Sequence, residues 1–166
     1  MKTLLILRHA KSGYPAGVAR DFDRPLAQRG VKEAPVVGRL LRASGPVPER
    51  IVSSPALRAR QTAEAVAAEL GLGARALCFE DRLYAAAPET LSAVAAGLAA
   101  SLGVVLFVGH NPGLEEWVGR LCGARVRLRT AALAQIDLPT DRWTDVESAS
   151  GQLQWLVVPR LLEALR

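Results

Sequence analysis

The alternation of short apolar runs with longer helix-like segments is the feature that most restricts the fold of this chain. Runs of strand length occur at residues 3–7, 50–53, 76–79 and 104–108, and segments with helical spacing of apolar residues separate them. This order is typical of an α/β fold, in which helices connect parallel strands. We therefore predict a three-layer sandwich, with a mainly parallel sheet and helices on both faces.

Local signals place the helices. They are predicted at residues 27–43, 54–70, 88–101 and 114–121. Pro35 suggests that the first helix starts later than its apolar pattern indicates. Ser54 and Pro55 suit a helix start, and Gly71 suits a helix end. In the less regular last third, strands at 132–138 and 153–158 are predicted to pair as a hairpin.

The length of 166 residues fits one domain, residues 1–166, and half of the residues are hydrophobic, which is enough for a sizeable core. The net charge of +5 and the pI of about 9.9 raise the question of a nucleic-acid partner. The arginines are scattered rather than clustered, so we predict no nucleic-acid binding. Arg125, Arg127 and Arg129 alternate along the chain, and this spacing indicates one face of a strand or turn that can attract an acidic partner.

Several other classes of protein are disfavoured. Cys78 and Cys122 lie in apolar sequence, which favours reduced thiols over a disulfide, and no Cys/His cluster has the spacing of metal ligands. The apolar run at the N-terminus ends at Arg8 and is too short for a signal peptide, and no run approaches the length of a membrane span. We therefore expect a soluble, cytoplasmic protein without a membrane partner.

The chain contains only two histidines, His9 and His110, and each closely follows a predicted buried strand. The ligand crevice of an open α/β sheet lies along the carboxyl ends of its strands. The two histidines are therefore expected to meet over one site, although they are about a hundred residues apart in sequence.

Two arginines point to a phosphate ligand at that site. Arg8 precedes His9, and Arg58 falls near the start of a predicted helix. A guanidinium matches phosphate oxygens, and a helix N-terminus favours an anion. Arg60 is two positions further along the helix and should face elsewhere, as part of a surface ion pair.

This constellation resembles the histidine phosphatase superfamily, which includes phosphoglycerate mutases. Segment 7–12 (LRHAKS) resembles its Arg-His-Gly signature, segment 53–64 (SSPALRARQTAE) its second motif, and segment 109–113 (GHNPG) its third. The motifs occur in the family's order, and the resemblance runs from residue 3 to about residue 138. It implies a phosphoglycerate mutase-like fold with His9, Arg8, Arg58 and His110 as catalytic residues.

The departures from the family pattern narrow the resemblance. Ala10 replaces the glycine of the signature, and Ala85 occupies the place where many members carry a glutamate acid. Glu80 and Asp81 lie nearby but out of register, and no long insertion is available to form a lid. Together with the RPL segment at 24–26, these features resemble the SixA-type phosphohistidine phosphatases.

The resemblance implies that His9 attacks phosphorus and becomes a phosphohistidine, without a metal or other cofactor. His9 must then be neutral, with its other ring nitrogen donating to a backbone carbonyl. Arg24 and Asp21 or Asp23 are candidates for substrate binding or water activation at the rim, and the alternative is that they belong to a charged surface loop. The implied partner is a phosphorylated protein or a small phosphorylated substrate. Two alternatives are a phosphatase for a small phosphate ester or sugar phosphate and a non-catalytic phosphate-binding module; the oligomeric state is not indicated.

Overall fold

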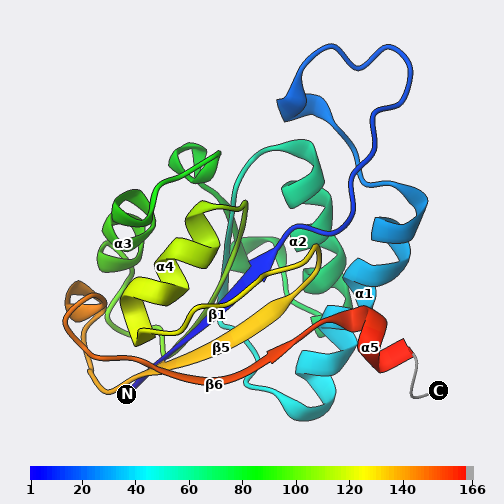
Figure 1. Ribbon diagram of the computed structural model, residues 1–166. Coiled ribbons are helices and arrows are strands. Elements are labelled where there is room, and N and C mark those ends of the chain that lie inside the picture. Colours follow the sequence, from blue (N-terminus) through cyan, green and yellow to red (C-terminus); the bar gives the residue numbers. More distant parts are fainter. Residues whose placement is uncertain (164–166) are drawn as a thin grey trace.

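A computed structural model describes residues 1–163, which form one six-stranded sheet between two layers of helices (Figure 1). The strands, in spatial order, are β3 (Leu77–Phe79), β2 (Arg50–Ser53), β4 (Val104–Gly109), β1 (Lys2–Arg8), β5 (Leu133–Leu138) and β6 (Gln152–Val157). The first four are parallel, whereas β5 and β6 run antiparallel to their neighbours. The predicted three-layer α/β fold is confirmed, and so is the terminal hairpin.

Helices cover both faces of the sheet. The α-helices are α1 (Gln28–Ser44), α2 (Leu57–Leu70), α3 (Pro88–Ala96), α4 (Gly113–Cys122) and α5 (Pro159–Glu163). Short 3-10 helices are η1 (Asp21–Asp23), η2 (Ala74–Ala76), η3 (Asp81–Leu83) and η4 (Trp143–Asp145). Figure 1 shows α3 and α4 on one side of the sheet and α1, α2 and α5 on the other. Among residues 1–163, no helix combines the length and apolarity needed to cross a bilayer.

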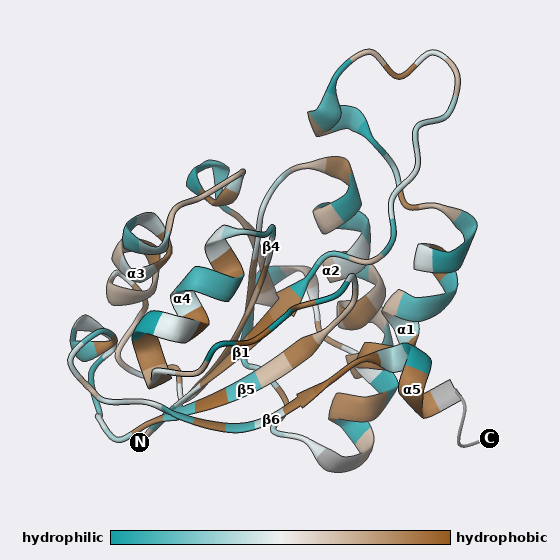
Figure 2. Ribbon diagram, in the orientation of Figure 1, coloured by the Kyte–Doolittle hydropathy of each residue, from teal (hydrophilic) through white to brown (hydrophobic). Residues whose placement is uncertain are grey.

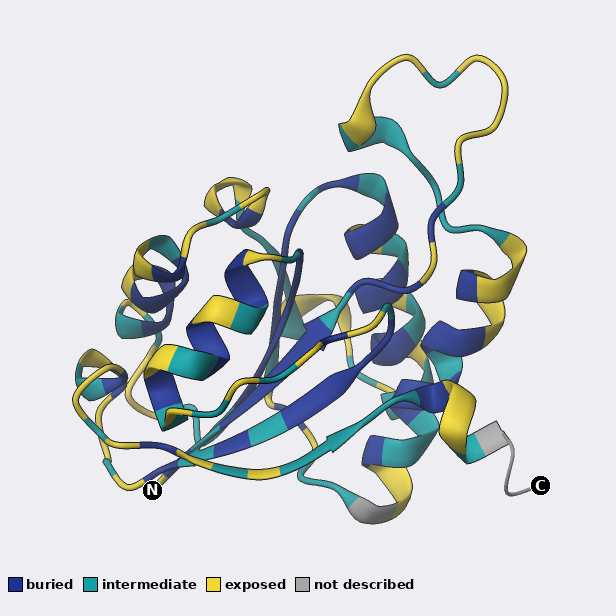
Figure 3. Cartoon of the chain, viewed as in Figure 1, coloured by how far each residue is buried: buried dark blue, intermediate teal, exposed yellow. Residues whose placement is uncertain are grey.

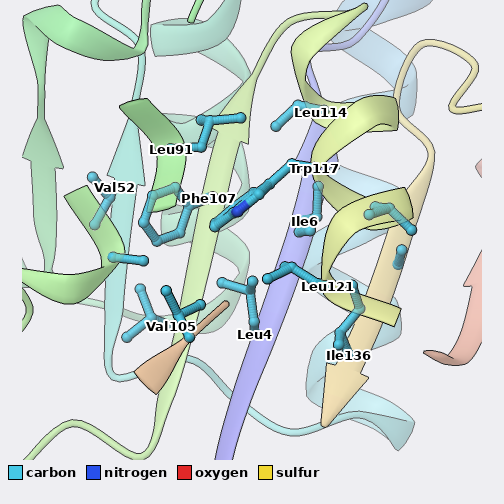
Figure 4. Close-up of a cluster of buried hydrophobic side chains, with 14 of the residues drawn as sticks. Leu4, Ile6, Val52, Leu91, Val105, Phe107, Leu114, Trp117, Leu121 and Ile136 are labelled. Carbon is cyan, nitrogen blue, oxygen red and sulfur yellow. The ribbon is translucent and has the colours of Figure 1, made fainter. Parts of the chain in front are cut away.

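The central strand β1 is buried on both faces, which explains its continuous apolar run. Leu4 and Ile6 pack toward α3 and α4, in the cluster of Figure 4, where the rings of Phe107 and Trp117 lie 5.1 Å apart between centroids. Leu5 and its neighbours on the other face pack toward α1 and α2. Figures 2 and 3 show these inner strands as largely hydrophobic and buried. Two packed layers therefore fix the direction in which the end of β1 points.

Three details predicted for the helices are wrong: the late start of the first helix suggested by Pro35, the start of the second helix and the end of the third. Helix α1 begins at Gln28 and contains Pro35 in its interior, because packing of α1 along α2 outweighs the backbone hydrogen bond that proline removes. Helix α2 begins at Leu57 after an extended Ala56, so Ser54 is not its cap. Helix α3 ends at Ala96, before Gly97, a residue with low helix propensity.

The segment between β1 and α1 projects from the body of the protein. Residues 13–27 carry η1 and are mostly exposed or half-buried, as Figure 3 shows at the loop of the upper right. Hydrogen bonds join the two ends of this segment. The Gly13 amide donates to the Pro25 carbonyl (3.1 Å), and the Ala27 amide donates to the Lys11 carbonyl (2.8 Å). The segment is therefore anchored at the carboxyl end of β1.

Candidate active site

His9 and His110 meet because their strands are neighbours. β1 and β4 pair in parallel with Arg8 opposite Gly109, and the His9 amide donates to the Gly109 carbonyl over 3.1 Å. The two imidazole rings lie 5.2 Å apart between centroids, and each histidine is only 7% exposed. The sequence-based prediction that the histidines share one site is confirmed.

The hydrogen bonds of His9 define its protonation. Its Nδ1 lies 2.7 Å from the Ala10 carbonyl oxygen, which can only accept, so Nδ1 carries the proton. Arg58 Nε donates to His9 Nε2 over 3.3 Å. Burial lowers the pKa of His9 to about 4, and the neighbouring arginines contribute to the shift. Near neutral pH, Nε2 is therefore unprotonated and accepts from Arg58. The neutral ring with its other nitrogen donating to a backbone carbonyl agrees with the expectation from the sequence.

His110 has the opposite tautomer. Arg58 Nη2 lies 3.4 Å from Nδ1 and can only donate, so Nε2 carries the proton and donates to Ser54 Oγ over 2.8 Å. Burial lowers the pKa of His110 to about 3, with further lowering by His9 and Arg58. Ser54 was expected to cap a helix, so its contact with His110 was not predicted. Its place in the second family motif, SSPA at 53–56, could have indicated a role in the site.

Arg58 occupies the centre of the site. It lies in the first turn of α2, is 6% exposed, and reaches both histidines. Thr62, one turn later, accepts from the Ala10 amide (3.0 Å) and donates to the Arg58 carbonyl (2.7 Å), so it joins α2 to the loop after β1. Arg60 faces away from the site and pairs with Glu64 over 3.4 Å. The expectation that Arg60 faces elsewhere, in a surface ion pair, is therefore confirmed.

The projecting segment brings Asp21, and not Asp23, into the site. Arg58 Nη1 donates to the Asp21 carbonyl (2.7 Å) and Nη2 to its carboxylate (2.9 Å), whereas Asp23 pairs with the exposed Arg20 over 2.6 Å. Arg24 supports this placement by donating to the Asp21 carboxylate over 3.1 Å and to Ser12 Oγ over 2.9 Å. The chain has no long insertion at this place, but the short segment 13–27 reaches Arg58 through Asp21.

Tyr84 is a further residue that the sequence analysis missed. Its hydroxyl donates to the Asp21 carboxylate over 2.9 Å, and its ring and that of His110 are nearly perpendicular, with centroids 5.6 Å apart. Partial burial raises the pKa of Asp21, but hydrogen bonds from Arg24, Tyr84 and Arg58 outweigh it and hold that pKa well below its usual range. Asp21 is therefore ionised at neutral pH.

Arg8 is half-buried and contacts the segment between α4 and β5. Its Nη1 donates to the Leu128 carbonyl over 2.9 Å, and its Nε is buried without a hydrogen-bond partner in the described part of the chain. Burial lowers the pKa of Arg8, but guanidinium remains charged at any physiological pH. The unpaired Nε–H is thus a donor in need of an acceptor.

The structure offers no carboxylic acid at the place of the family's glutamate. Ala85 has a φ of 50°, at the end of the turn that carries Tyr84. Glu80 is held by Arg82 through two hydrogen bonds of 2.9 Å to the guanidinium, which lower its pKa. Asp81 is exposed. Within residues 1–163, no group of three or more His, Cys, Asp or Glu side chains is arranged to hold a metal ion, and Cys78 and Cys122 are free thiols.

Comparisons with known proteins agree with this geometry. Residues 4–83 match the histidine phosphatase superfamily (branch 1). An uncharacterised protein of Mycobacterium tuberculosis is 36% identical over 165 residues, covering 93% of this chain and all of the relative. A solved structure of a putative phosphohistidine phosphatase SixA from Nakamurella multipartitia has a TM-score of 0.82 and 31% identity, covering 95% of this chain and 96% of the other.

A second solved structure is that of the protein histidine phosphatase SixA in complex with tungstate. It has a TM-score of 0.82 and 27% identity, and it covers 96% of this chain and 99% of the other. The similarity to both structures therefore extends well beyond residues 4–83, the segment that matches the family.

Proposed function

This chain belongs to the histidine phosphatase superfamily and is a phosphatase, and we propose that it removes the phosphoryl group from phosphohistidine on a protein. His9 is the proposed nucleophile. The observation that carries the proposal is the state of the His9 ring, in which the bond to the Ala10 carbonyl leaves Nε2 unprotonated in a buried, arginine-lined site.

The proposed reaction has two displacements. In the first, the Nε2 electron pair of His9 forms a bond to phosphorus, while the phosphorus–nitrogen bond of the substrate breaks and its electron pair stays on the substrate imidazole. In the second, water attacks the phosphoryl group, the bond to His9 breaks, and inorganic phosphate leaves. A nucleophile of this kind must be neutral at the attacking atom, and the low pKa of His9 supports that state at neutral pH.

Arg58, Arg8 and His110 are proposed to hold the three equatorial oxygens of the phosphoryl group. Phosphoryl transfer depends mainly on positioning and on compensation of the oxygen charges. Arg58 supplies donors next to both histidines, and Arg8 supplies its unpaired Nε–H. A bound phosphate would displace the Asp21 carboxylate from Arg58 or share that guanidinium with it. We propose that these arginines make a metal unnecessary.

The absence of a positioned acid supports phosphohistidine over phosphate esters. An alkoxide leaving group needs a proton as its bond breaks. Among the described residues, Asp21 is held ionised and Glu80 is engaged by Arg82, so neither is placed to supply one. Imidazole has a conjugate-acid pKa of about 6.5 and leaves much more readily than an alkoxide. The same reasoning places aryl phosphates between the two classes.

The test is a comparison of kcat/KM for a phosphohistidine peptide, an aryl phosphate, and the alkyl esters phosphoserine and a sugar phosphate. We expect activity to decrease in that order, with turnover unaffected by EDTA. Glu80→Gln and Asp81→Asn should retain the same order, since neither carboxyl acts as the acid.

Two results would contradict the proposal. Hydrolysis of the sugar phosphate as fast as of phosphohistidine, with a large loss in either variant, would establish a general acid and an ester substrate. Loss of turnover in EDTA with restoration by a divalent metal would contradict metal independence. Binding of phosphate without turnover of any of the substrates would instead support a non-catalytic phosphate-binding module.

A further inference from the structure

An open cavity of about 490 Å³ lies on the Arg8 side of the site. We call this cavity the basic pocket, because five cationic side chains and one carboxylate line it. They are Arg8, Lys11, Arg29, Arg127, Arg129 and Glu115. The proposed two-step reaction at His9 uses only Arg8 from this set. The other cations therefore have no role in the chemistry described so far.

Most of the positive charge of the basic pocket is uncompensated. The carboxylate of Glu115 lines the same cavity and offsets one cation, since burial lowers the pKa of Arg8 and the charge of Glu115 raises it. Arg29 pairs with Glu33 over 3.2 Å. Among residues 1–162, Lys11, Arg127 and Arg129 form no ion pair. Three charges thus remain available for an anionic ligand.

The wall of the basic pocket is fixed to the catalytic loop. The segment between α4 and β5 runs to the end of β1 (Figure 1), where the Ala131 amide donates to the carbonyls of both Arg8 and His9 over 3.1 Å. The Arg8 side chain donates to the Leu128 carbonyl in the same wall. An anion bound in the basic pocket would therefore lie at a fixed distance and direction from His9.

Exposed arginines alternate with a buried leucine along this wall, so the arginine side chains point away from the core. Leu128 is fully buried, whereas Arg127 and Arg129 on either side of it are exposed and line the pocket. Arg125 is also exposed in the same segment but does not line the pocket. It is consequently a matched control for the charge of the segment.

We propose that the basic pocket binds carboxylates of the protein substrate that lie close in sequence or space to its phosphohistidine; this inference rests on the proposed function. The cations come from three separate segments of the chain and surround an open cavity, so they suit several dispersed monovalent groups. Glu115 at the cavity repels a phosphate dianion about twice as strongly as a monovalent carboxylate at the same distance. Acidic residues around the phosphohistidine would then act as the specificity determinant.

The test uses two peptides that carry a stable phosphoryltriazole analogue of phosphohistidine, one flanked by Asp and Glu and the other by Ser and Ala. Their inhibition of aryl phosphate hydrolysis is measured in the wild type, in Arg127→Ala/Arg129→Ala and in Arg125→Ala, at low and at high salt. The readout is the ratio of the two inhibition constants within each variant, which cancels any change in the phosphate site itself.

We expect the wild type to prefer the acidic peptide by roughly tenfold at low salt, since exposed ion pairs contribute modestly and are screened. The ratio should fall close to one in the double variant and at high salt, and remain tenfold in Arg125→Ala. Equal inhibition by both peptides in the wild type would overturn the proposal, as would an equal loss in Arg125→Ala.

Inorganic pyrophosphate tests the alternative that the ligand of the basic pocket is a small polyanion rather than a protein carboxylate. Inhibition by pyrophosphate that exceeds that of the acidic peptide and requires Arg127 and Arg129 would assign the basic pocket to a small polyanion and overturn the inference. Because the peptides are not hydrolysed, the preference can be found even if the enzyme fails to turn over phosphohistidine. Such a failure would contradict the proposed function alone.

Discussion

Acidification from pH 7 to pH 5 is expected to destabilise the folded protein through its two buried histidines. The pKa of His9 is lowered to about 4 and that of His110 to about 3, from an ordinary value of 6.5. Below pH 6.5 the unfolded chain therefore binds more protons than the folded one. The stability that the neutral histidines provide is complete above pH 6.5 and is lost as the pH falls toward the folded-state values.

The size of the loss follows from the same shifts. At pH 5 each histidine would still be neutral in the folded state and charged in the unfolded state, which costs about 2 kcal/mol per residue and about 4 kcal/mol for the pair. This is a large part of a typical unfolding free energy of about 5–15 kcal/mol. Carboxylates such as Asp21, whose pKa is also lowered, contribute mainly below pH 5, because unfolded carboxylates titrate near pH 4.

Urea unfolding at pH 7 and at pH 5, followed by tryptophan fluorescence, measures this difference. The single variants His9→Asn and His110→Asn should each show about half of the wild-type difference, since one titrating group is removed in each. A wild-type difference below about 1 kcal/mol would refute the reasoning, because it would mean that the histidines titrate close to their ordinary pKa in the folded protein.

Two further outcomes test the proposed chemistry. His9→Ala should lose nearly all activity, and near-normal turnover by this variant would exclude His9 as the nucleophile. Wild-type enzyme quenched during turnover should carry phosphate that is labile in acid and stable in alkali. A loss of kcat/KM on the order of a hundredfold is expected in each of Arg8→Ala, Arg58→Ala and His110→Ala. The control Arg60→Ala, from the same helix as Arg58, should change kcat/KM by less than about twofold. Similar losses in Arg58→Ala and Arg60→Ala would contradict the assigned geometry.

Local sequence patterns were sufficient for the architecture and for the meeting of the two histidines. The apolar runs before His9 and His110 indicate buried parallel strands, and parallel strands end at one edge of a sheet. The expected tautomer of His9 was also confirmed, because Nδ1 lies within hydrogen-bond distance of the Ala10 carbonyl in that turn. These features depend on short stretches of chain and on general rules of sheet topology.

Contacts between distant segments were decided by the tertiary structure alone. Residue type does not distinguish Asp21 from Asp23, but the placement of η1 brings only Asp21 to Arg58. Tyr84 reaches His110 and Asp21 from a turn with no recognisable motif, and Ser54 serves His110 rather than a helix end. Periodicity and capping rules describe the backbone within about one helical turn, whereas these partners depend on how separate layers pack and on which side chains that packing directs toward one another.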